Sequence, residues 1–528
     1  MTVFTGTAAQ LRLLLRLQRL KIILWPLVFG GLAYAMHDSF RTLYPGQAER
    51  DAYAALNEAS PVLKAINGPG YGLSTHGGIL VFEIGGYLLA VGALLAAFLV
   101  VAHTRREEES GRAELVAAAP QGTLAAPAAA ALGLVLFAAW TAAVMTGVFI
   151  LAADLPLRGT LAYTGGLAAI MVLFGAVALV VVQFTARASA ASSLAGLLIG
   201  VAYAVRAAGD AGDDEALRAA SPFGWVQATR PFDDERFWPL FVTVGGAIAL
   251  TAVAGVLHTR RDLGAGLVQP RPGPARASGW LRGIVSLRIK EFWAGAAGFV
   301  VLVFALAALF GAAGEDVTDV FASGDGFGEL VGMPGATATD AYLTLVLSLL
   351  TLLITAVALS WSQRLRRDER QGLAEAELAT PTRRRLWFLS DAATAVAGVA
   401  AAVVALGLGL GLAYDAVTDG DGTVGDVLAA ALHQLPAALL LVGLSYLLYG
   451  LLPRIQPVIW VLFGFCAVVS LLAGALQLED EVIDLSPFSH MPDLVNDEVG
   501  AASIVVLGAA LVAVLVGAAG MERRDVPA

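Results

Sequence analysis

Long apolar runs separated by short polar segments dominate the chain. Each run is close to the roughly 20 residues that a helix needs to cross a bilayer. The runs fall at about 22–38, 78–102, 124–152, 160–184, 190–208, 238–257, 291–313, 341–362, 386–413, 427–451, 455–477 and 500–521. This pattern predicts an all-α polytopic membrane protein with about twelve transmembrane helices, six in each half.

A charged segment between the second and third runs has a copy in the second half. Residues 105–120 read RREEESGRAELVAAAP, and residues 366–381 read RRDERQGLAEAELATP, 261 positions later without a gap. Half of the aligned positions are identical, which richness in alanine alone would not give. The chain is therefore interpreted as two copies of one unit. Because each unit has an even number of spans, the repeats are predicted to be parallel and not inverted.

This repeat divides the chain into domains. A first six-helix transmembrane domain is expected over residues 1–262 and a second over residues 280–528. Residues 263–279 are expected to form a cytoplasmic linker, since they contain the sequence GAGLVQPRPGP, which is rich in glycine and proline.

Basic residues at helical spacing precede the first span. Arg12, Arg16 and Arg19 lie among leucines over residues 11–21, which predicts an amphipathic helix in the membrane interface. Residues 280–292 are its expected counterpart in the second half.

Composition and charge support this picture. Hydrophobic residues make up 58% of the chain and charged residues 14%, against about a quarter charged in a soluble domain. With the N-terminus inside, 25 of the 33 lysines and arginines fall in segments on that side. The positive-inside rule therefore places both termini and both charged segments in the cytoplasm.

Each charged segment is expected to form a helical elbow. The helix that leaves the membrane should break at Gly111, resume for one or two turns and stop at Pro120. A single charged elbow is ordinarily a solvated loop, but duplication weakens that interpretation. Two equivalent elbows suggest two equivalent sockets, as a dimeric cytoplasmic partner would offer.

At these residues the sequence resembles a known family. The Arg-Glu-Glu run, the glycine, the Ala-Glu-Leu triplet and the closing proline resemble the coupling region of type-2 ATP-binding-cassette (ABC) exporter permeases. The sequence SPFGW at 221–225, Gln183 followed by Arg187, and YAVRAAGD at 203–210 are similar to the actinobacterial branch that exports polyketide antibiotics, the tetronasin-type permeases. The second half departs from the pattern, with Leu373 in place of Arg112 and His490 in place of Trp225.

The resemblance implies a permease subunit in the bacterial plasma membrane that extrudes lipophilic antibiotics or drugs. Two copies of a cytoplasmic ABC ATPase subunit would be its partners, with ATP and Mg bound by those subunits. The chain itself is expected to be no enzyme and to hold no cofactor, since it contains no G-x-x-x-x-G-K-[ST] phosphate loop, and no nucleic-acid partner is expected. By carry-over, the residues that couple to the ATPase would be Arg106, Glu107, Glu108, Gly111, Glu114, Arg367, Asp368, Glu369, Gly372 and Glu375.

Polar and ionisable side chains inside the expected spans are the remaining candidates. They are Glu83, Asp391, His433 and Gln434. Glu83, His433 and Gln434 are candidate residues of the substrate path. Each lies close to a predicted span end, so contact with the membrane interface explains it equally well.

Two other function classes remain open from the sequence. A proton-coupled secondary drug transporter also has two parallel six-helix halves, although the first elbow lacks the Gly-x-x-x-Asp-Arg-x-Gly-Arg-Arg loop of the major-facilitator class. A membrane enzyme or scaffold is the third class, but the sequence contains no His/Cys metal cluster and no carboxylate pair at catalytic spacing.

Overall fold

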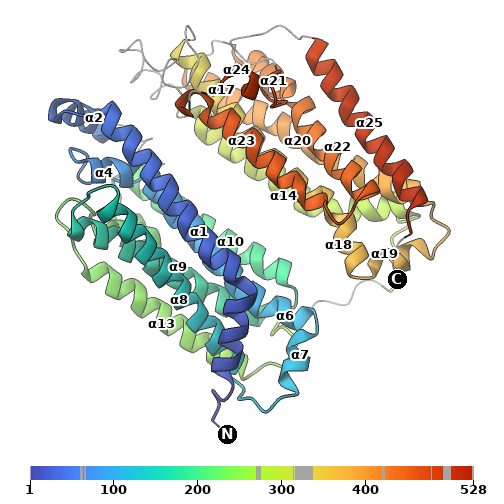
Figure 1. Ribbon diagram of the computed structural model, residues 1–528, viewed down its shortest axis with the longest axis horizontal. Coiled ribbons are helices and arrows are strands. Elements are labelled where there is room, and N and C mark those ends of the chain that lie inside the picture. The colour runs from blue at the N-terminus through green and yellow to red at the C-terminus, as the bar shows by residue number, and fades with distance from the viewer. Residues whose placement is uncertain are drawn as a thin grey trace. The chain divides into compact units, whose positions relative to one another are not determined.

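The computed structural model describes residues 2–59, 64, 67–268, 275–312, 314, 337–418, 422–476, 478–491 and 501–525. Within these residues every regular element is helical (Figure 1). The chain divides into two compact units, Met1–Gly273 and Pro274–Ala528. The boundary falls inside the segment that the sequence marks as a linker.

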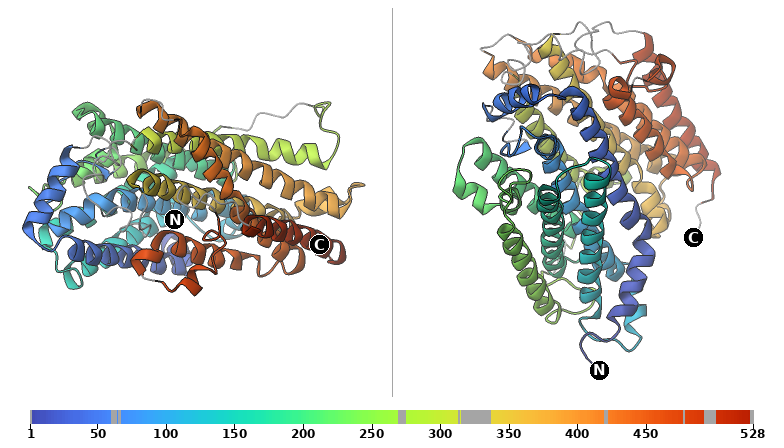
Figure 2. Two further views of the ribbon diagram at one scale, coloured as in Figure 1. Left: turned by 90° about the horizontal axis from the view of Figure 1, so that it is seen from above. Right: turned by 60° about the vertical axis from the view of Figure 1, so that its left-hand side comes forward.

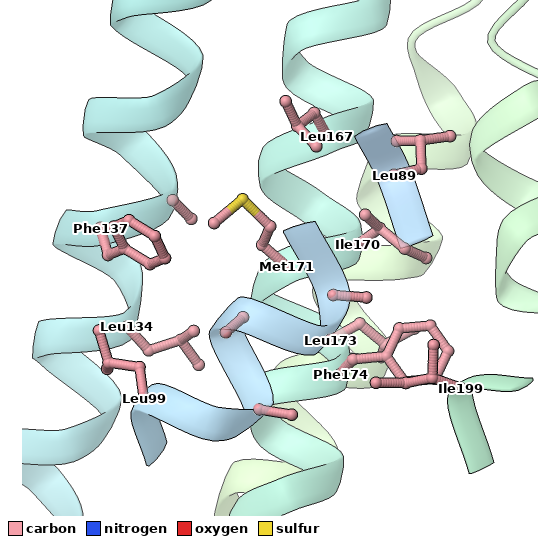
Figure 3. Packing of buried hydrophobic residues seen from close by; sticks show 14 of the residues in the cluster. Leu89, Leu99, Leu134, Phe137, Leu167, Ile170, Met171, Leu173, Phe174 and Ile199 are labelled. Carbon is pink, nitrogen blue, oxygen red and sulfur yellow. The ribbon is translucent and has the colours of Figure 1, made fainter. Parts of the chain in front are cut away.

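The first unit is a bundle of long helices with short helices at both ends. Its elements are α1 (Thr7–Leu43), α2 (Gln47–Ala59), α4 (His76–Leu80), the π-helix η1 (Val81–Gly85), α5 (Gly86–His103), α6 (Arg105–Glu109), α7 (Arg112–Ala117), α8 (Ala125–Leu151), α9 (Leu157–Phe184), α10 (Ala188–Ala211), α11 (Glu215–Ala220), α12 (Pro222–Gln227) and α13 (Trp238–His258). Helix α9 is central, because α5, α8 and α13 all pack against it. Figure 3 shows this core, with Ile170, Met171 and Phe174 of α9 between Leu89 of α5 and Phe137 of α8.

The second unit repeats the order of the long helices and of the two short elbow helices. Its elements are α14 (Ile284–Ala312), α17 (Ala338–Ser362), α18 (Arg364–Arg370), α19 (Leu373–Leu378), α20 (Arg384–Val417), α21 (Val424–His433), α22 (Leu435–Leu451), the 3-10 helix η2 (Gln456–Val458), α23 (Ile459–Leu476), α24 (Asp480–Ile483) and α25 (Ala501–Arg523). The packing also repeats, because α14 packs on α20 as α1 packs on α8, and α22 packs on α25 as α9 packs on α13.

The predicted spans agree with the helices. Among the described residues, eleven helices are long and apolar enough to cross a membrane. The twelfth expected run, 455–477, is occupied by η2 and α23, whose described apolar stretch Gln456–Leu471 is shorter. The expected all-α polytopic membrane fold is therefore confirmed.

The prediction of a separate interfacial helix before each half is wrong. Residues 11–21 are the first part of α1, which continues without a break to Leu43 and runs beside α8 (Figure 2). No glycine or proline separates this segment from the first span, and Pro26 is accommodated inside the helix, as membrane helices often allow. Residues 284–292 are likewise the first turns of α14.

Gly407, Gly409 and Gly411 of α20 lie at points of close helix packing. A Cβ atom on Gly409 would lie 2.6 Å from the backbone oxygen of Phe304 in α14. Cβ atoms on Gly407 and Gly411 would lie 2.9 and 3.0 Å from backbone atoms of α21. Since α20 buries two faces against neighbouring helices, these glycines allow both helices to approach it closely.

Candidate coupling site: a duplicated helical elbow

Both charged segments form the same backbone shape. In the first unit, α6 ends at Glu109, Gly111 has φ of 72° and α7 follows. In the second unit, α18 ends at Arg370, Gly372 has φ of 73° and α19 follows. A residue with a side chain pays about 1–2 kcal/mol in this left-handed conformation. Glycine therefore sets the turn in each elbow, which is the break that the sequence predicted.

Each elbow is joined to the last helix of its own unit by an ion pair. The Arg261 guanidinium donates to both carboxylate oxygens of Glu108, at 2.5 and 2.8 Å. At the equivalent position, the Arg524 guanidinium donates to both oxygens of Glu369, at 2.9 and 2.8 Å. Arg261 follows α13, and Arg524 follows α25. The same connection is thus built twice, between the segment that leaves the second long helix and the end of the sixth.

Neighbouring groups complete each of these ion pairs. In the first unit, the Arg105 Nη1 atom lies 2.9 Å from Glu108, and the guanidinium also donates to the carbonyls of Val182 and Ala265. Arg105 is fully buried. In the second unit, the Tyr449 hydroxyl donates to Glu369 at 2.8 Å. Because these carboxylates accept several charge-assisted hydrogen bonds, both elbows are held firmly at their base.

The carboxylate that precedes Glu108 or Glu369 in the sequence has different partners in the two units. Glu107 accepts two hydrogen bonds of 2.7 Å from Arg112, within the elbow. Its counterpart Asp368 lacks that partner, because Leu373 stands where Arg112 does. Arg288 at the start of α14 takes its place, at 3.0 Å.

Arg288 also binds a second carboxylate of the elbow. It is nearly fully buried and lies 2.5 Å from Glu377 of α19. The indole nitrogen of Trp387 donates to the same Glu377 oxygen. The second elbow is therefore tied to both the first and the last helix of its unit.

The remaining coupling candidates face solvent. Arg106, Glu114, Arg367 and Glu375 are exposed. So are two apolar side chains that the sequence did not single out, Leu115, which is 78% exposed, and Leu373, which is 51% exposed. Each elbow thus presents charged and apolar groups outward and keeps Glu108 or Glu369 for contacts inside its unit.

The substrate-path candidates lie in different units. Glu83 lies in the π-helix of the first unit and accepts a hydrogen bond from Tyr53 of α2. Burial, followed by the Glu83 charge, raises the pKa of Tyr53 far above its usual value, so its hydroxyl remains a donor. His433 and Gln434 lie in the second unit, where α21 meets α22, and Gln434 is buried.

Asp391 belongs to a buried network that sequence reasoning missed. Its carboxylate accepts from Arg364 at 2.7 Å and from the Tyr446 hydroxyl at 2.7 Å. Arg364 lies at the start of α18, so this network fixes the position where the second elbow begins. A structural role explains the buried charge of Asp391.

A sequence signal for Arg261 and Arg524 does exist. The triplet Arg-Arg-Asp follows the last span of each half, at 260–262 and at 523–525. Repeated charged triplets at equivalent places indicate equivalent contacts, but their partners lie about 150 positions away. No local pattern identifies such partners.

Comparison with known proteins identifies the family. Residues 281–522 match the family model described as "Multidrug efflux system permease Rv1217c, C-terminal domain". The chain is 36% identical to the multidrug efflux system permease protein Rv1217c of Mycobacterium tuberculosis over 537 aligned positions, which cover 99% of this chain and 96% of the relative. The chain therefore belongs to the family of multidrug efflux system permeases.

Proposed function

We propose that this permease is the membrane subunit of an ATP-driven ABC exporter that extrudes lipophilic antibiotics or drugs. The relative is named for multidrug efflux, and a membrane subunit whose helices are mostly apolar suits a lipophilic molecule that needs few polar contacts. Tetronasin-type polyketides are one substrate class within this proposal.

The duplicated elbow carries the proposal. A rigid turn at Gly111 or Gly372 projects a short helix from each unit, and an ion pair to the last helix supports each turn. A push on α7 or α19 would therefore reach the long helices of that unit without being lost in a flexible loop. Two similar projections suit two copies of one ATPase subunit.

The docking surface is proposed to comprise the exposed residues of both elbows. They are Arg106, Glu114 and Leu115 in the first unit, and Arg367, Leu373 and Glu375 in the second. Glu107, Glu108, Asp368 and Glu369 would contribute indirectly, by holding α6 and α18 in place. Gly111 and Gly372 would set the angle at which the short helices meet the partner.

The proposed exporter has a defined orientation in the membrane and takes its energy from ATP. Both termini and both elbows are proposed to lie in the cytoplasm of a bacterium, as the distribution of arginine indicates. ATP and Mg would bind to the partner subunits. Closure of those subunits would push the elbows and rock the helices of each unit between two arrangements.

Affinity purification of the full chain from its native membrane tests the proposal. We expect a soluble ATPase to co-purify at about two copies per chain, and drug transport by the reconstituted complex to require ATP. If the chain purifies alone and moves a drug in response to a pH gradient, the proton-coupled alternative is correct.

A further inference from the structure

A pocket of about 470 Å³ opens beside the second elbow. Its charged lining residues are Arg366, Glu369, Arg370, Glu375, Arg454 and Arg524. Gly372 and Pro453 complete the wall. The pocket therefore lies between α18, the turn into α19 and the connection from α22 to η2.

Positive charge is in excess in this pocket. Arg524 and Glu369 neutralise each other. Among the residues that the structure describes, none of Arg366, Arg370 and Arg454 has a carboxylate within salt-bridge distance. The Arg366 guanidinium donates to the Arg454 carbonyl, at 3.3 Å. Three guanidinium groups therefore face one exposed carboxylate, that of Glu375.

The first unit differs at the two equivalent positions that the structure describes. Arg105 corresponds to Arg366, but it is fully buried and bound to Glu108 and to two carbonyls. Glu109 corresponds to Arg370, and its carboxylate accepts the Ala188 backbone N–H at 2.9 Å, at the start of α10. The change from a carboxylate to a guanidinium converts a satisfied capping contact into a free anion-binding group.

Apolar side chains continue from the basic pocket. Leu451 and Leu452 precede Pro453, and Ile455 and Val458 follow Arg454. All four are between 45% and 56% exposed. In a multi-pass membrane protein, such side chains face hydrocarbon, whereas arginines at the helix ends reach the headgroup layer. A molecule that combines an anionic head with apolar chains matches this arrangement.

We propose that this pocket binds the anionic headgroup of a phospholipid, with its phosphate on Arg366, Arg370 and Arg454. The acyl chains would lie along Leu452, Ile455 and Val458. Guanidinium groups suit phosphate because they offer two parallel N–H donors. With the elbow in the cytoplasm, the lipid comes from the inner leaflet, where basic clusters bind anionic lipids. The bound lipid braces α18 against the connection that follows α22.

Native mass spectrometry of the full chain tests this site. The purified protein, in a neutral detergent, is titrated with phosphatidylglycerol or with phosphatidylcholine of identical acyl chains. We expect a tight phosphatidylglycerol adduct and no comparable phosphatidylcholine adduct. Neutralising one arginine, in Arg370→Gln or Arg454→Gln, should weaken phosphatidylglycerol binding about fivefold, which corresponds to about 1 kcal/mol per basic residue. The reversal Arg370→Glu, which restores the residue type of the first unit, should weaken it more.

Arg385→Gln is the matched control. Arg385 is exposed on α20 of the same unit and does not line the pocket, so this variant should bind phosphatidylglycerol as the natural chain does. Equal loss in Arg385→Gln and Arg370→Gln would show a general charge effect and overturn the proposal. Equal binding of both lipids would also overturn it.

Two further outcomes identify other occupants. If inorganic phosphate displaces phosphatidylglycerol at equal concentration, the pocket is a site for a soluble anion. If Arg370→Glu abolishes co-purification of an ATPase and leaves the lipid adduct unchanged, the arginines belong to a protein interface. Either result refutes the lipid site, and neither bears on whether transport requires ATP.

Discussion

Glu108 and Arg261 lie 153 positions apart in the sequence and join through two hydrogen bonds at the base of the first elbow. Their side chains are 7% and 3% exposed. We expect Glu108→Gln to lower the free energy of unfolding by about 3 kcal/mol, because it leaves Arg261 buried without its counter-charge. The thermal midpoint of the purified chain measures this loss.

A double-mutant cycle makes that test specific. Adding Arg261→Gln to Glu108→Gln should cost little more than the first change alone, since the two residues act as one unit. Glu114→Gln, which changes an exposed carboxylate of the same elbow, is the control and should leave the midpoint unchanged. A midpoint for Glu108→Gln equal to that of Glu114→Gln would contradict the prediction.

Reversing the exposed elbow charges should uncouple the transporter. We expect the double variant Glu114→Arg with Glu375→Arg to insert normally but to lose drug transport, because the ATPase contacts these surfaces in the proposed complex. Transport by membrane vesicles, together with the amount of co-purified ATPase, reports the effect. The control is Glu215→Arg with Glu481→Arg, which reverses two exposed carboxylates on α11 and α24. Unchanged export by the elbow variant would show that the ATPase does not dock on Glu114 and Glu375.

The glycine turns offer a test of backbone geometry alone. Gly111 has φ of 72°, and a Cβ atom there would meet no atom within 4 Å. Gly111→Val should therefore cost about 1–2 kcal/mol through backbone strain only, while Gly111→Asn should cost less, because asparagine tolerates this conformation. Hydrogen exchange of the α7 amides should be faster in the valine variant than in the asparagine variant. Identical exchange in both would show that the turn is not under this constraint.

Arg288 and its counterpart in the first unit contribute unequally to the stability of their units. Arg288→Leu should destabilise the second unit by several kcal/mol, because Asp368 and Glu377 lose their common partner. Arg19 is the counterpart of Arg288, because the sequence Arg-x-Lys occurs at 19–21 and again at 288–290. Arg19→Leu should have little effect, since Arg19 is exposed. Thermal midpoints of the two single variants measure this difference.

A second-site change tests the explanation. Leu373→Arg, placed in the Arg288→Leu chain, should restore part of the lost stability, because the equivalent Arg112 pairs with Glu107 in the first unit. If Leu373→Arg brings no recovery, the compensation between Arg288 and Arg112 is not real.

The sequence predicted the shape of the elbows but not their attachments. Glycine followed by one turn and a proline is a local pattern, so the breaks at Gly111 and Gly372 could be read directly. The partners Arg261 and Arg524 are distant in the sequence, and only the fold brings them to Glu108 and Glu369. A carboxylate that docks to a partner and a carboxylate that pairs inside the chain have the same appearance in the sequence, so the pattern could not distinguish these roles.

The start of each unit shows a second limit. Basic residues at helical spacing over 11–21 fit an interfacial helix and the first turns of a spanning helix equally well. In the structure α1 continues through Pro26 and packs against α8, and no window of the sequence contains that contact. Helix type was therefore predictable here, but the boundary between surface and span was not.

The different partners of Glu107 and Asp368 have a consequence for how the chain evolves. In a permease assembled from two identical chains, every substitution appears in both elbows at once. Here Arg112 pairs with Glu107 in one copy, whereas Arg288 pairs with Asp368 in the other, so the position of Arg112 is free to differ between the copies. A single gene with two repeats can thus accumulate unequal halves, and a variant resistant to an inhibitor of one elbow would need to change only that elbow.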